Sequence, residues 1–127
     1  MQDVNVVVVF NSADETVERL ALAAAVGAVQ GRALIRLRRF HGTPESREYV
    51  TPRDPDAEWA HAFVIGGAAV TEEAKLWMER LHKRGGLPII TLEGDTPEAA
   101  QHTGRVAAQM GRAAKERLSA VSSQPSA

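Results

Sequence analysis

The chain of 127 residues contains no cysteine, which excludes disulfides, thiolate metal sites and a cysteine nucleophile. No apolar run approaches the roughly 20 residues that span a bilayer. The N-terminus lacks a basic start and a small-residue cleavage site, so we expect no secretory signal. Basic and acidic residues nearly balance, at 15 and 16, which leaves no broad positive surface for nucleic acid. These absences predict a soluble, cytoplasmic domain with neither a membrane nor a nucleic-acid partner.

Apolar runs typical of strands alternate with helical patterns along the chain. The first run, Val4 to Phe10, is mostly β-branched, which is typical of a strand buried on both faces. Pro88 confines the last strand to an edge of the sheet, or begins it, because proline cannot donate to a ladder. The expected strands are 4–10, 33–37, 61–65 and 87–92, and the expected helices are 15–30, 71–83 and 96–118, with one helical turn near 55–59.

This alternation predicts an α/β fold with a doubly wound parallel sheet of about four strands and helices on both faces. We expect residues 1–118 to form one domain, near the commonest domain size. Residues 119–127 are rich in serine, proline and glutamine, and we expect a flexible tail there. Gly31, directly after the first helix, is expected to stop it.

The turn after the first strand is where a nucleotide phosphate usually binds, because free backbone N–H groups and the helix dipole point outward there. Here it reads Asn-Ser-Ala-Asp-Glu-Thr and contains no glycine. In one interpretation, Ser12 and Thr16 donate hydroxyls to a phosphate. In the other, Ser12 and Glu15 form a capping box, in which the protein's own carboxylate takes the amides that an anion would need.

Magnitudes favour the capping box. A carboxylate about 5 Å from a phosphate charge costs roughly 3 kcal/mol at an effective dielectric constant of about 20. The helix terminus offers a bound anion only about 0.3–2 kcal/mol in return. The two carboxylates Asp14 and Glu15 therefore argue against a phosphate at this turn.

Three segments, taken in order along the chain, carry a resemblance to a known family. They are Val6–Phe10 with Ser12, Val17, Leu20 and Ala21; Phe63–Gly66 with Glu73–Leu81; and Thr96–Ala100 with Gly104–Ala107. The sequence resembles the flavodoxin-like NAD(P)H:quinone oxidoreductases related to the tryptophan-repressor-binding protein, although it is shorter. The resemblance implies a flavodoxin-like fold with sheet order 2-1-3-4, an FMN site at the carboxyl ends of the strands, and oligomers.

The resemblance is poorest at the flavin loops. Ser12 and Thr16 match polar positions of the family's first loop, but Glu15 falls on its glycine. The second loop is shortened to Gly66-Gly67-Ala-Ala, and a third segment has no counterpart between residues 81 and 87. If FMN or another ligand binds, the resemblance implies Ser12, Thr16, Gly66 and Gly67 as its contacts. We expect no catalytic residue and no metal ligand.

Other polar and aromatic residues have structural interpretations that we favour. The four histidines lack the short helical spacing of a metal site. The arginines at 32, 36, 38 and 39 could form an anion patch, but alternation places Arg36 and Arg38 on one face of an edge strand, where charge discourages aggregation. Trp59 and Trp77 could stack on a planar ligand. Trp77 lies among the apolar positions of a helix, so packing or a subunit contact is the favoured alternative for it.

These observations leave three hypotheses for function. The favoured one is a flavodoxin-like domain that has lost FMN and acts as a non-catalytic or regulatory interaction domain without a cofactor. The second is a minimal FMN-dependent NAD(P)H:quinone oxidoreductase or electron carrier, and the third is a module that binds another small molecule. We expect a homo-oligomer, with a dimer favoured. Its self-complementary face is expected either around Trp77 and Leu81, or around Ala107, Met110 and Ala114.

Overall fold

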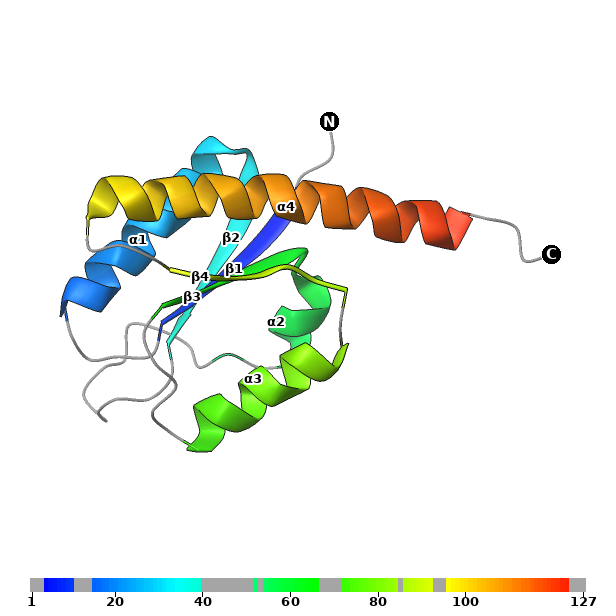
Figure 1. The fold of residues 1–127 in the computed structure, drawn as a ribbon, viewed down its shortest axis with the longest axis horizontal. Helices are drawn as coiled ribbons and strands as arrows, with labels where there is room; N and C mark the ends of the chain where they lie inside the picture. The colour runs from blue at the N-terminus through cyan, green and yellow to red at the C-terminus, as the bar shows by residue number, and fades with distance from the viewer. Residues whose placement is uncertain are drawn as a thin grey trace.

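The computed structural model describes residues 4–10, 15–39, 52, 54–66, 72–84, 86–92 and 96–123. Strands and helices alternate as predicted, and the short helix near 55–59 is present (Figure 1). Within the described ranges, no helix combines the length and the apolar character needed to cross a membrane. The elements in chain order are β1 (Val4–Phe10), α1 (Glu15–Gln30), β2 (Ala33–Arg39), α2 (Asp54–Trp59), β3 (Ala62–Gly66), α3 (Glu72–Arg84), β4 (Ile89–Thr91) and α4 (Pro97–Ser123).

The four strands form one parallel sheet in the order β2-β1-β3-β4, which confirms the predicted fold class and strand order. Helices α1 and α4 cover one face of the sheet, and α2 and α3 cover the other (Figure 1). After β1 the chain adds β2 on one side and β3 on the other. The sheet therefore has its topological switch point between β1 and β3.

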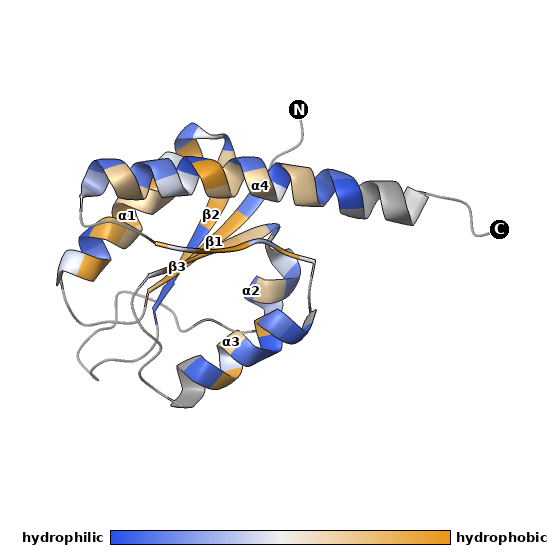
Figure 2. Cartoon of the chain, in the orientation of Figure 1, coloured by the Kyte–Doolittle hydropathy of each residue, from blue (hydrophilic) through white to orange (hydrophobic). Residues whose placement is uncertain are grey.

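The side chains of β1 supply both layers of the core. Val4, Val6, Val8 and Phe10 face α1 and α4, whereas Val7 and Val9 face α2 and α3. All six are fully buried, which confirms the prediction of a strand covered on both faces. Figure 2 shows the strands largely in hydrophobic colours between helices of mixed polarity.

Two residues predicted as a subunit contact belong to this core. Trp77 of α3 is only 2% exposed and packs edge-on against Phe63, with ring centroids 5.8 Å apart. Leu81, one turn later, is also buried. The packing interpretation of Trp77 is confirmed, and the prediction that Trp77 and Leu81 form a face for a second chain is wrong.

Helices α1 and α4 cross with their backbones in contact. A Cβ atom added at Gly27 would lie 1.9 Å from the carbonyl oxygen of Gln101. One added at Gly104 would lie 1.9 Å from the carbonyl oxygen of Ala24. Only glycine leaves room for so close an approach, so this pair fixes how the two helices sit on the sheet.

The ends of several elements differ from the prediction. Gly31 does follow α1, but the residue with positive φ is Arg32, at 65°. Strand β4 is shorter than predicted and begins after Pro88, at an edge of the sheet as expected. Helix α4 continues to Ser123, past the predicted end at Leu118, so the expected tail is partly helical. Its first turn is capped as predicted, with the Ala99 amide donating to Thr96 Oγ1 at 3.2 Å.

Candidate functional site

Ligands of doubly wound folds bind outside the carboxyl ends of the strands, at the switch point. The parallel register places Phe10 of β1 opposite Arg39 of β2 and Gly66 of β3. Leu92 continues this row, because its amide donates to the Ile65 carbonyl at 2.8 Å. This edge of the sheet is the candidate site.

The side chains around Gly66 are apolar. A Cβ at Gly66 would lie 3.1 Å from Leu92 Cδ2, 3.6 Å from Phe10 Cβ and 3.8 Å from Val17 Cγ1. Phe10 is fully buried, and the other two pack against the same cluster under α1 and α4. On this face of the sheet, the protein's own side chains therefore fill the space beside Gly66.

The predicted contacts are only partly within the described residues. Thr16 lies exposed in the first turn of α1, and the side chain of the adjacent Val17 approaches Gly66. Ser12, Gly67 and the side chain of Glu15 lie outside the described part of the chain. The capping box of Ser12 and Glu15 stays a prediction.

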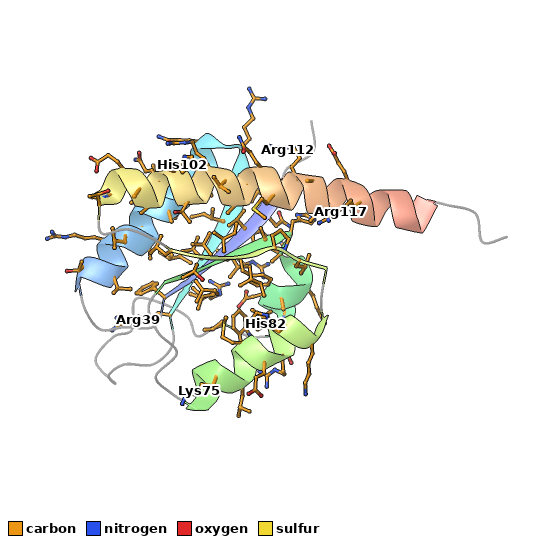
Figure 3. The ribbon with its side chains drawn as sticks, in the orientation of Figure 1. Arg39, Lys75, His82, His102, Arg112 and Arg117 are labelled. Carbon is orange, nitrogen blue, oxygen red and sulfur yellow. The ribbon has the colours of Figure 1, made fainter. Side chains whose placement is uncertain are left out.

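One cationic side chain lies at this edge. The guanidinium carbon of Arg39 is 5.8 Å from the centroid of the Phe10 ring, within the range of a cation–π contact. Figure 3 shows Arg39 at the end of the sheet. Arg32 lies before the opposite end of the same strand, so the four arginines do not form one patch. The sequence spacing of Arg32 and Arg39 was enough to place them far apart, because a seven-residue strand spans roughly 23 Å.

The other two arginines of β2 face α2 and share one carboxylate. Arg36 and Arg38 each approach a different oxygen of Asp56, both at 3.1 Å. The Asp56 side chain is 5% exposed, and the Arg36 guanidinium also lies 4.2 Å from the centroid of the Trp59 ring. The prediction that Arg36 and Arg38 share one face of β2 is therefore confirmed, and on that face they bind a buried carboxylate that the sequence did not indicate.

His61 occupies the opposite end of the sheet, before β3. Its Nδ1 accepts the Asn5 backbone N–H at 2.9 Å, and its own amide donates to the Asn5 carbonyl at 2.7 Å. The Asn5 side chain in turn donates to the Trp59 carbonyl at 2.8 Å. Burial, followed by the positive charge of Lys115, lowers the pKa of His61 below its ordinary value. The neutral imidazole fits this acceptor role, so His61 has a structural task.

The described residues offer little for acid–base or metal chemistry. Among them, no three histidine or acidic side chains come together as a metal site would require. Among the described residues, the candidate edge has the Arg39 guanidinium, the exposed hydroxyls of Thr16 and Thr91, and an apolar floor. These groups can contact a protein partner or bind an anion weakly. The described side chains at this edge do not include a nucleophile with an adjacent base.

No protein-family model and no curated protein matches the chain. Among solved structures it is similar to a flavodoxin from the domain Archaea, at 12% identity and a TM-score of 0.52, with 88% of this chain and 99% of that chain covered. A diflavin flavoprotein A3 from Nostoc sp. aligns at 12% identity and 0.49, covering 94% and 99%. The lactose-specific IIB component domain of a phosphotransferase system from Streptococcus pneumoniae aligns at 17% and 0.42, covering 85% and 93%. At such identities the likeness to the archaeal flavodoxin concerns the fold alone, and the chain has a flavodoxin-like fold.

Proposed function

We propose that this flavodoxin-like domain has lost FMN binding and acts without catalysis, as an interaction domain that forms a homo-oligomer. The observation that carries the proposal is the packing beside Gly66. Phe10, Val17 and Leu92 converge there, at the switch point where a doubly wound fold would admit a ligand.

Electrostatics supports the same conclusion. Asp14 and Glu15 stand in the sequence where the resembling family has its phosphate loop. One carboxylate about 5 Å from a phosphate charge costs roughly 3 kcal/mol at an effective dielectric constant of about 20. The dipole of α1 returns at most about 2 kcal/mol to a bound anion. The guanidinium of Arg39, a cation at this edge, lies against the Phe10 ring.

The test is a titration of FMN with the purified protein, followed by flavin fluorescence. We expect a colourless preparation and no quenching at FMN concentrations of about 10 µM, which corresponds to a free energy of binding weaker than about −7 kcal/mol. A yellow protein with stoichiometric FMN would contradict the proposal. It would favour a minimal FMN-dependent NAD(P)H:quinone oxidoreductase or electron carrier.

A matched variant separates charge from shape. Replacing Asp14 with Ala and Glu15 with Gly removes both carboxylates and supplies a loop glycine. If repulsion alone prevents binding, this double variant gains FMN affinity by about tenfold or more. If the packing beside Gly66 prevents FMN from binding, the double variant still does not bind FMN. In that case only the further replacement Leu92→Ala makes room for the flavin.

A further inference from the structure

A groove follows the outer side of α4 along the open edge of the sheet. It consists of two hollows of about 800 and 390 Å³, the larger beside residues 86–88, just before β4, and the smaller beside β4 itself. The larger is lined by Gly86, Leu87, Pro88, Met110, Ala113, Glu116 and Arg117, and the smaller by Ile89, Ile90, Thr91, His102, Thr103 and Val106. The last turns of α4 also extend beyond the sheet (Figure 1). This surface of α4 is therefore not covered by the described part of its own chain.

Five of the seven residues that α4 contributes to the groove have the spacing of a helix-packing seam, and the other two, His102 and Glu116, lie beside them. The five recur at alternating intervals of three and four, the period that keeps side chains on the side of a helix facing a second helix. Met110 in the middle is 44% exposed. We call this set the α4 stripe; it comprises Thr103, Val106, Met110, Ala113 and Arg117.

The α4 stripe differs from the face predicted from sequence. Ala107 and Ala114 are fully buried in the domain, so they cannot contact a second chain. Met110 is the one member of the predicted face that lies in the α4 stripe and is exposed. The prediction of a contact on the last helix therefore moves to the neighbouring side of that helix.

The polar side chains beside the α4 stripe are complementary to a second copy that runs the opposite way, because an imidazole N–H can donate to a carboxylate. His102 and Glu116 are exposed, and each lies two helical turns from the exposed Gln109, on the same side of α4. In an antiparallel pair centred on Gln109, His102 of each copy faces Glu116 of the other, and Gln109 faces its equivalent. A parallel pair would not bring His102 and Glu116 together, because they lie roughly 21 Å apart along the helix. Figure 3 shows His102 and Arg117 near opposite ends of this surface.

We infer that the α4 stripe is a homodimer interface, on which α4 of a second copy packs antiparallel. This inference rests on the proposed function, in which the domain acts through association. Val106 of one copy then lies against Met110 and Ala113 of the other, and the small Ala113 side chain admits the partner helix closely. The same contact partly covers the apolar groove beside Leu87 and Pro88.

The first experiment is sedimentation velocity of the full chain at concentrations up to about 100 µM, a range that detects dissociation constants of that order. The wild type is expected to dimerise. Met110→Asp places two carboxylates close to the two-fold axis and weakens association by about tenfold or more. Val26→Asp is the matched control, because Val26 is 47% exposed on the outer side of α1, away from the α4 stripe.

A charge exchange tests the orientation. His102→Glu weakens dimerisation because it places two carboxylates opposite one another, and Glu116→Lys weakens it because it removes the carboxylate that accepts from His102. The double variant places a carboxylate opposite an ammonium group and restores dimerisation to within about twofold of the wild type. A role of either residue within its own fold would not be rescued in this way. Circular dichroism and thermal melts confirm that all variants fold.

Three results would overturn the inference: a monomeric wild type, a dimer that Val26→Asp disrupts and Met110→Asp does not, or a double variant that stays as weak as the single ones. Its failure is distinguishable from failure of the proposed function. A yellow FMN protein that dimerises through α4 contradicts only the proposed loss of FMN. A colourless dimer that Met110→Asp does not weaken contradicts only the α4 interface, whereas a colourless monomer contradicts both the interface and the proposed association.

Discussion

Replacing Gly27 by alanine tests the α1–α4 crossing. The new Cβ would lie 1.9 Å from the Gln101 carbonyl oxygen, 2.7 Å from its carbonyl carbon and 2.9 Å from its Cα. Real Cβ atoms essentially never approach another atom within 3.0 Å, so the helices have to separate by more than an ångström. The obstacle is backbone, which no change of rotamer can move.

The magnitude follows from two opposing effects. Overpacking of this kind costs typically about 1–3 kcal/mol, and a backbone obstacle places this case at or above the upper end. Alanine gains about 1 kcal/mol over glycine through helix propensity. We therefore expect Gly27→Ala to lower the free energy of unfolding by about 2 kcal/mol, which corresponds to a melting temperature lower by roughly 6–10 °C.

The assay is urea unfolding followed by far-UV circular dichroism, at one fixed protein concentration because association adds to apparent stability. Val26→Ala is the matched control. It is the adjacent residue, it is 47% exposed, and alanine there gains helix propensity without meeting another atom. The reasoning is refuted if Gly27→Ala is as stable as the wild type, because the helices would then not cross this closely.

Two further predictions concern ionisable groups. Asp56→Asn removes the buried carboxylate that two arginines of β2 share, and we expect it to lower the free energy of unfolding by about 2–3 kcal/mol. The control, Asp54→Asn, changes an exposed carboxylate and is expected to alter that free energy by less than about 0.5 kcal/mol. Equal urea midpoints for the two variants would contradict this. Burial and then the Lys115 charge lower the pKa of His61 below 6.5, so the unfolded chain binds a proton more readily than the folded one, and stability falls as the pH drops below about 6.5. In His61→Asn, whose amide oxygen can still accept the Asn5 N–H, urea melts between about pH 5.5 and 7.5 should show a shallower fall, and an unchanged slope would reject the assignment.

Local patterns predicted most of the fold because each reports a physical requirement that acts over a few residues. The β-branched run from Val4 to Phe10 requires burial on both faces, and the sheet provides it. Pro88 restricts its strand to an edge of the sheet or precedes the strand, and β4 does lie at an edge, after Pro88. Thr96 favours the start of a helix, and it caps the first turn of α4. The end of α4 was misplaced because Ser and Ala after Leu118 permit either a helix or a tail.

The features that the sequence did not predict depend on contacts between distant segments. Nothing in the periodicity of α1 or α4 indicates that Gly27 meets the backbone near Gly104. Likewise, Asp56 lies in a charged, proline-containing segment, where a buried carboxylate cannot be told from an exposed one. At the candidate site, the position of Gly66 was predicted, but the convergence of Val17 and Leu92 on it was not, since they come from separate elements.

The crossing of α1 and α4 also affects how the protein folds during synthesis. The two helices are joined across it by Arg105 and Gln30, which are 75 residues apart in the chain. A nascent chain that has released β1, α1 and β2 from the ribosome still lacks the helix that covers α1. Until α4 emerges, the alanine-rich side of α1 stays open to water and to chaperones, so α4 completes this layer of the core.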